Sequence, residues 1–154
     1  MTREEQLGMV GKKLLALDYG ERRIGVAVCD SMHIVVSTRP IIDNTPDVLE
    51  KVVESCTKDQ IEVIIVGVPR HHDDRSTQII KRILEFVTQL RLHTSLPVFE
   101  ADEAFSTKEA RQIMIANGTK KKKRQTKGVK DQVAAAVILR DVIEEIRSNT
   151  PQQL

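Results

Sequence analysis

The chain has 154 residues, 40% of them hydrophobic and 30% charged, which is the composition of one soluble domain with its own core. Aromatic residues make up only 3%, which argues against a binding surface of stacked aromatic rings. No segment is long and apolar enough to span a membrane, nothing at the start resembles a signal peptide, and two cysteines do not make a disulfide framework. We therefore expect a cytoplasmic protein without a membrane partner.

The formal net charge of +2 hides an uneven distribution. One segment is strongly basic and contains no acid; its charged residues are Lys120, Lys121, Lys122, Lys123, Arg124, Lys127 and Lys130. The rest of the chain is net acidic. Such a run is either a solvated, mobile segment or an arm that binds nucleic-acid phosphates, because clustered Lys and Arg give affinity that does not depend on base sequence.

The first part of the chain predicts an antiparallel meander of three strands. Residues 13–18 and 23–29 are apolar segments typical of buried strands, and the short turn between them contains Gly20. Residues 33–42 predict the third strand of the meander.

Helices and strands are expected to alternate after this meander. Thr45 and Pro46 indicate a helix start, because Thr caps helices and Pro is tolerated at the first helical position. The later expected elements are a strand at 61–66 stopped by Gly67 and Pro69, a helix after Asp73, a strand at 96–99, a helix from Ser106 to Asn117 and a helix from 128 to about 147. This order predicts an α/β fold with a mixed five-stranded sheet flanked by helices, in a single domain over 1–154. We expect loose tails at 1–12 and 149–154 and a mobile basic loop at 118–127.

Acidic side chains stand at three junctions between these elements. Asp18 ends the first strand. Asp102 and Glu103 follow the strand at 96–99, and Asp131 lies in the first turn of the last helix. Open α/β sheets bind ligands at strand ends, so acids that meet there form an oxygen-rich site suited to Mg²⁺ or Mn²⁺. Two such ions can activate water and stabilise the leaving oxygen in phosphodiester cleavage.

Each acid also has a purely structural explanation. Asp18 fits a turn, Asp102 and Glu103 are equivalent by residue type, and Asp131 favours a helix start through the helix dipole. The four histidines are not spaced as metal ligands, and we find no Ser-His-Asp arrangement, Walker A loop or dinucleotide-binding glycine motif.

Four short segments occur in an order that a known family shares. They are Leu17-Asp18-Tyr19-Gly20 with Arg22-Arg23-Ile24-Gly25-Val26-Ala27, then Val66-Gly67-Val68-Pro69, then Asp102-Glu103-Ala104-Phe105-Ser106-Thr107, and finally Lys127-Gly128-Val129-Lys130-Asp131 before Ala134-Ala135-Ala136. Each segment is a weak signal alone, but together they resemble the YqgF family, also called RuvX-like, from about Leu14 to Ile146.

The resemblance implies a ribonuclease H-like fold and a metal-dependent nuclease that processes the 5′ end of precursor 16S rRNA in ribosome biogenesis. It implies that the catalytic and metal-binding acids are Asp18, Glu103 and Asp131, with Mg²⁺ or Mn²⁺ as cofactor. The residues expected to bind nucleic acid are Arg22, Arg23, Lys120, Lys121, Lys122, Lys123, Arg124 and Lys127. The chain departs from the family pattern at Ala104, where the motif has arginine, and in the segment 70–74.

Other functions remain open beside the favoured processing of structured precursor rRNA. A Holliday junction resolvase acting on branched DNA has the same active site and needs a symmetric dimer for paired cuts. A non-catalytic nucleic-acid-binding assembly factor depends mainly on the basic loop. A sugar-kinase or actin-like ATPase is disfavoured, because such proteins need two lobes. The sequence does not decide between a monomer and a homodimer.

Overall fold

The computed structural model describes residues 1–69, 74–103 and 127–150. The expected helix from Ser106, the basic residues 120–124, the replacement at Ala104 and the end of the C-terminal tail lie outside these residues. Within the described part of the chain, no helix has the length and apolar character needed to cross a membrane.

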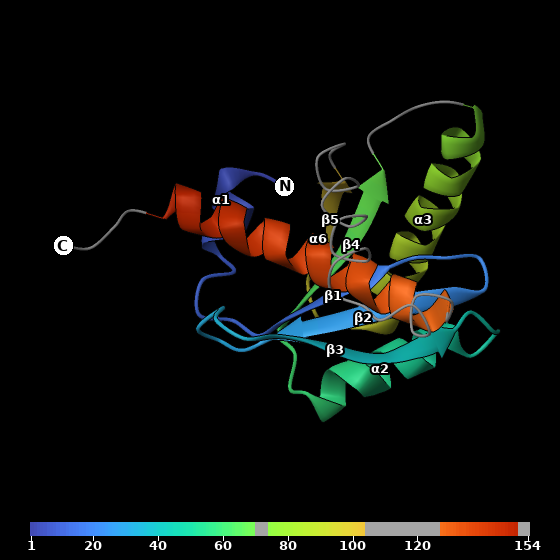
Figure 1. Cartoon of the computed structure of the whole chain (residues 1–154), viewed down its shortest axis with the longest axis horizontal. Coiled ribbons are helices and arrows are strands. Elements are labelled where there is room, and N and C mark those ends of the chain that lie inside the picture. The colour runs from blue at the N-terminus through green and yellow to red at the C-terminus, as the bar shows by residue number, and fades with distance from the viewer. Residues whose placement is uncertain (70–73, 104–126, 151–154) are drawn as a thin grey trace.

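Five strands and four helices are described (Figure 1). In chain order they are α1 (Arg3–Leu7), β1 (Leu14–Asp18), β2 (Arg23–Cys29), β3 (Val36–Asp43), α2 (Val48–Lys58), β4 (Val63–Pro69), α3 (Asp74–His93), β5 (Val98–Glu103) and α6 (Lys127–Asn149). The strands form one sheet in the order β3-β2-β1-β4-β5. Strand β2 pairs antiparallel with both β1 and β3, whereas β4 pairs in parallel with both β1 and β5. The expected mixed five-stranded α/β sheet is confirmed.

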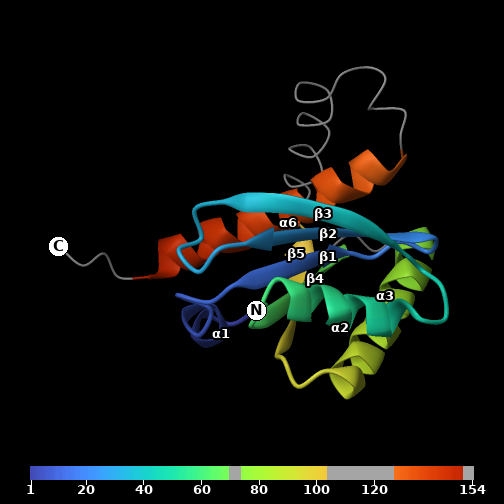
Figure 2. The ribbon, with the colours of Figure 1, turned by 90° about the horizontal axis from the view of Figure 1, so that it is seen from below.

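The two faces of the sheet carry two separate cores. Successive side chains of a strand point to opposite faces. Leu15 and Leu17 of β1 belong to the core formed with α2 and α3, whereas Leu14 and Ala16 belong to the core formed with α6. Figure 2 shows α2 and α3 on one side of the sheet and α6 on the other. The alanines at 134–136 are buried, as expected for a helix that lies close to the sheet.

Both parallel strands β4 and β5 extend further than the sequence indicates. The prediction that Gly67 and Pro69 stop β4 is wrong, because β4 continues to Pro69 and pairs there with Glu103. The expected strand at 96–99 is displaced to Val98–Glu103 for the same reason. Pairing across the sheet therefore overrides the local signals of glycine and proline and places Glu103 within a strand.

The predicted starts of β3 and α2 also shift. Residues 33–35 belong to a loop, in which the Asp30 carboxylate accepts hydrogen bonds from the backbone of Ile34 and Val35 at 2.8 and 2.9 Å. Helix α2 begins at Val48, not at Thr45 and Pro46, and Asp47 occupies its N-cap position. The Thr45 hydroxyl donates to the Asp47 carboxylate, and its carbonyl accepts from the Val48 N–H, so the segment forms a turn before the helix.

The N-terminal segment is ordered, contrary to the expected loose tail at 1–12. Thr2 and Glu5 form a capping box that starts α1. Gln6 is buried and donates from Nε2 to Glu145 Oε2 of α6 at 2.7 Å. Met9 is fully buried in the α6-side core. The segment is ordered because its few apolar atoms complete that core. At the other end of the chain, Asn149 is the last residue of α6, and the Thr150 hydroxyl donates to the Ile146 carbonyl of that helix. Residues 151–154 lie outside the described residues.

Cys29 and Cys56 are both free and buried. Burial raises the pKa of Cys29 to about 11 and that of Cys56 to about 12. The reactive thiolate is therefore scarce at pH 8, and we expect the folded protein to react with iodoacetamide much more slowly than the urea-unfolded chain. Mass spectrometry of timed samples measures both rates. Equal labelling of either cysteine in the two states would contradict the described packing.

Candidate active site

Asp18 and Glu103 lie at the same edge of the sheet and on the same face. They are the last residues of β1 and β5, and the parallel pairing through β4 brings those strand ends together. The residues two and four positions before Asp18 belong to the α6-side core, and so does Ala101, two positions before Glu103. Side chains alternate along a strand, so both acids face α6 whereas Asp102 faces the opposite side. The geometry thus pairs Glu103, and not Asp102, with Asp18.

Gly67 of β4 leaves room for the Glu103 side chain between the sheet and α6. A Cβ atom on Gly67 would lie 2.7 Å from Glu103 Oε1 and 2.6 Å from Ile138 Cδ1 of α6. Leu17 pairs with Val66, so the next row of the parallel register places Gly67 beside Asp18. The Glu103 carboxylate therefore lies over the strand that neighbours Asp18.

Gly25 of β2 leaves room for the backbone of the third acid, Asp131. A Cβ atom on Gly25 would lie only 1.9 Å from the backbone oxygen of Asp131 and 2.5 Å from its carbonyl carbon. Gly25 is also the register partner of Asp18. The backbone of Asp131 thus rests on the strand next to Asp18. The end of β1 at Asp18 therefore lies between β4, over which the Glu103 carboxylate lies, and β2, on which the Asp131 backbone rests.

Arg23 brings a positive charge to this group. Its Nε atom lies 3.4 Å from Asp131 Oδ2, and the two side chains are 30% and 29% exposed. The Nε atom is buried and makes no hydrogen bond within the described part of the chain. The positive charge of the guanidinium therefore offsets some of the repulsion among the acids.

The turn between β1 and β2, which follows Asp18, carries Arg22. Asn44, just after β3, holds this turn: its Nδ2 donates to the Gly20 carbonyl at 2.9 Å and its backbone N–H donates to the Arg22 carbonyl at 2.8 Å. Arg82 of α3 also forms an ion pair with Glu21 of the turn. Arg22 itself is exposed. Its side chain is therefore offered to solvent from an anchored backbone.

The family model described as "RuvX: Holliday junction resolvase" matches residues 12–145. The chain belongs to this family. A relative in Phocaeicola vulgatus, named "Putative pre-16S rRNA nuclease", is 35% identical over 133 residues, which cover 86% of this chain and 95% of the relative. A relative of the same name in Christiangramia forsetii is 34% identical and covers 86% of this chain and 98% of its own. The RuvX match spans all three acids.

Two solved structures share the fold of this RuvX-family chain. The structure titled "T. thermophilus RuvC in complex with Holliday junction substrate" aligns with a TM-score of 0.52 at 13% identity, covering 82% of this chain and 92% of that one. The Fowlpox virus resolvase in a complex with Holliday junction DNA aligns with a TM-score of 0.53 at 13% identity, covering 86% and 97%. These likenesses confirm the ribonuclease H-like fold expected from the sequence.

The donor chemistry of the RuvX acids fits a hard divalent cation, because all three candidate ligands are carboxylates. Within residues 1–69, 74–103 and 127–150, however, no three His, Cys, Asp or Glu side chains are close enough together to hold a metal ion. The three acids are therefore neighbours at one edge of the sheet without forming a closed set of ligands.

Several residues that shape this site are not evident from the sequence. Gly25 and Gly67 occur in the family-like segments, but their role as space for Asp131 and Glu103 depends on contacts between distant elements. Asn44 follows a strand like many turn residues, and no local signal connects it with the β1–β2 turn. Of the expected basic residues, Lys127 begins α6, its side chain is not described, and those at 120–124 lie outside the described residues.

Proposed function

We propose that this RuvX-family chain is a metal-dependent nuclease that processes the 5′ end of precursor 16S rRNA. The observation that supports the proposal is that the two strands flanking the end of β1 carry glycines against which the other acids pack: Gly67 of β4 lies against the Glu103 carboxylate, and Gly25 of β2 lies against the Asp131 backbone. The names of relatives 31–35% identical to this chain support rRNA as the substrate.

We assign the metal-binding and catalytic roles to Asp18, Glu103 and Asp131, with Mg²⁺ or Mn²⁺ as the cation. When bound, such ions supply charge that activates water and stabilises the leaving oxygen of a phosphodiester. The residues that would hold such an ion are Asp18 and Glu103, at the ends of β1 and β5, and Asp131, in α6. When no metal ion is bound, Arg23 reduces the mutual repulsion of the three acids, because its Nε lies 3.4 Å from Asp131 Oδ2.

Arg22 and the basic residues at 120–127 are proposed to contact the phosphate backbone. Arg22 is exposed on the anchored β1–β2 turn, directly after the strand that ends in Asp18. Phosphate contacts of this kind select the shape of a paired RNA more than its base sequence. The two free, buried cysteines fit a reducing cytoplasm, which is where we place the protein.

A second candidate function is the resolution of branched DNA, favoured by the description of the family model. One experiment separates the candidates: purified protein is incubated with a precursor 16S rRNA fragment and with a four-way DNA junction, in Mg²⁺, in Mn²⁺ and in EDTA. We expect metal-dependent cleavage at the 5′ side of the RNA and an intact junction. Paired cuts in the junction alone would instead establish the resolvase. Binding of RNA without cleavage in either metal would establish an assembly factor.

A further inference from the structure

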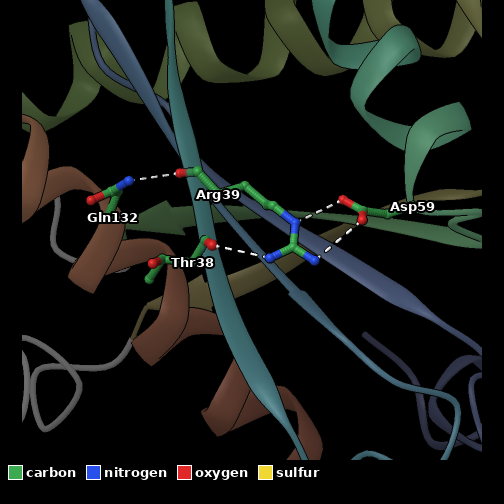
Figure 3. A network of polar contacts seen from close by, with 4 residues as sticks. All are labelled: Thr38, Arg39, Asp59 and Gln132. Atoms are coloured by element: carbon green, nitrogen blue, oxygen red, sulfur yellow. Dashed lines mark hydrogen bonds and ion pairs between the residues drawn. The ribbon is translucent and has the colours of Figure 1, made fainter.

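Gln132, the residue after Asp131 in α6, forms a hydrogen bond to the edge strand β3. Gln132 Nε2 donates to the backbone carbonyl of Arg39 at 2.8 Å, in a half-buried position (Figure 3). Asp131 itself rests on Gly25 of the neighbouring strand β2. Two adjacent residues of α6 therefore contact two adjacent strands, one through van der Waals contact and one through a hydrogen bond.

Both contacts lie at an irregularity in the pairing of β2 with β3. Ile24 pairs with Ile42 and Val26 pairs with Arg39, so β3 has one more residue than β2 between these rows. This is a β-bulge opposite Gly25, and it begins directly after Arg39 with Pro40, which has no N–H to donate. The first described turns of α6 thus sit where the strand is bent and the ladder is interrupted.

The acceptor of the Gln132 bond is held from the other side of the sheet. The Arg39 guanidinium donates to both carboxylate oxygens of Asp59, at 2.9 and 3.2 Å, and to the Thr38 carbonyl at 3.2 Å. Asp59 is the C-cap residue of α2. Figure 3 shows this network running from α6 through β3 to the end of α2. These contacts of the Arg39 side chain restrain the residue whose carbonyl accepts from Gln132.

We infer that Gln132 is a positioning residue that sets the place of the Asp131 carboxylate relative to Asp18. Successive residues of an α-helix are separated by roughly 100° around its axis. A bond from Gln132 to β3 therefore resists rotation of α6 that would swing Asp131 away from β2. Asp131 also forms an ion pair with Arg23, whose Nε lies 3.4 Å from Asp131 Oδ2. This inference rests on the proposed catalytic role of Asp131.

The chain offers a matched control at the other end of α6. Gln6 Nε2 donates to Glu145 and Gln6 Oε1 accepts from Asn149, so Gln6→Met removes a glutamine that hydrogen-bonds to the same helix at its other end. Gln132→Met removes the donor near Asp131 while keeping side-chain volume. If Gln132 acted only on stability, both variants would lower the melting temperature and change nothing else.

The experiment measures Mn²⁺ binding by calorimetry, cleavage of the precursor RNA and the melting temperature of both variants. We expect Gln132→Met to weaken Mn²⁺ binding and lower kcat by about 10-fold, with KM unchanged, since partners that orient a metal ligand have effects of this size. Gln6→Met is expected to match the wild type in both. Gln132→Lys, which retains a donor, is expected to restore most of the loss, and Gln132→Leu, which also lacks a donor, replaces Gln132→Met if that variant does not fold.

The possible results separate the inference from the function beneath it. A wild type that binds Mn²⁺ and cleaves RNA, with a Gln132→Met variant equal to Gln6→Met, overturns the positioning role alone. A wild type that neither binds Mn²⁺ nor cleaves overturns the proposed function and the inference with it. Mn²⁺ binding that depends on Gln132 in a protein without RNA cleavage supports the positioning role and rejects the rRNA substrate.

Discussion

If Asp18 has the proposed role of metal ligand, replacing it with asparagine is expected to reduce cleavage more than about 100-fold, because removing a ligand costs more than removing an outer partner, which already costs about 10–100-fold. Asp18 ends the strand that lies between the two strands on which Glu103 and Asp131 pack, so it is the central acid of the three. The amide keeps the shape of the side chain, and the fold and RNA affinity are expected to change little. Single-turnover cleavage, RNA binding in EDTA and thermal melting measure these three quantities separately.

Asp102→Asn is the matched control for this substitution. Asp102 is also an acid near the end of a strand at this edge, but it is exposed and points to the face opposite Glu103. We expect its cleavage rate to stay close to that of the wild type. If the two variants lose activity equally, net charge at the sheet edge matters more than a particular ligand. Full activity in Asp18→Asn, in a preparation free of other nucleases, would remove Asp18 from the site.

The succession of strands along the chain and the position of Asp18 and Glu103 at the ends of strands follow from patterns that are local in the sequence. Apolar segments ending in Asp18 and preceding Glu103 are recognisable because a buried strand needs such a run of side chains, and parallel strands place their ends at a common edge. The choice of Glu103 over Asp102 required the resemblance to a family. The structure supplies the physical reason, since only Glu103 shares the α6 face with Asp18.

The parts that sequence reasoning missed depend on contacts between distant segments. Gly67 looks like a strand stop, yet it continues β4, and its missing side chain makes room for Glu103. The segment at 1–12 looks polar and loose, yet Met9 and Gln6 bind it to α6. Gln132 carries no signal at all, because its acceptor is a backbone carbonyl far away in the sequence. Such features depend on the register between elements, which residue type alone does not specify.

Gly25→Ala is expected to be the most damaging of the small substitutions at this site. The added Cβ would lie 1.9 Å from the Asp131 backbone oxygen, far inside contact distance. The obstacle is backbone, so no rotamer change relieves the overlap, and either α6 or β2 must move. Overpacking of this kind costs about 1–3 kcal/mol of unfolding free energy, and it separates Asp131 from Asp18 as well. Urea denaturation and single-turnover cleavage measure the two effects.

Gly67→Ala distinguishes loss of stability from displacement of an acid. Its Cβ would meet the tips of the Ile138 and Glu103 side chains, at 2.6 and 2.7 Å, and side-chain tips can rotate away. We therefore expect a smaller loss of unfolding free energy than in Gly25→Ala, but a clear loss of cleavage, because the Glu103 carboxylate must leave its place beside Asp18. Normal cleavage by both alanine variants would show that neither contact is needed to gather the acids. A stable Gly25→Ala protein without cleavage would instead show that the contact between β2 and α6 serves chiefly to hold Asp131.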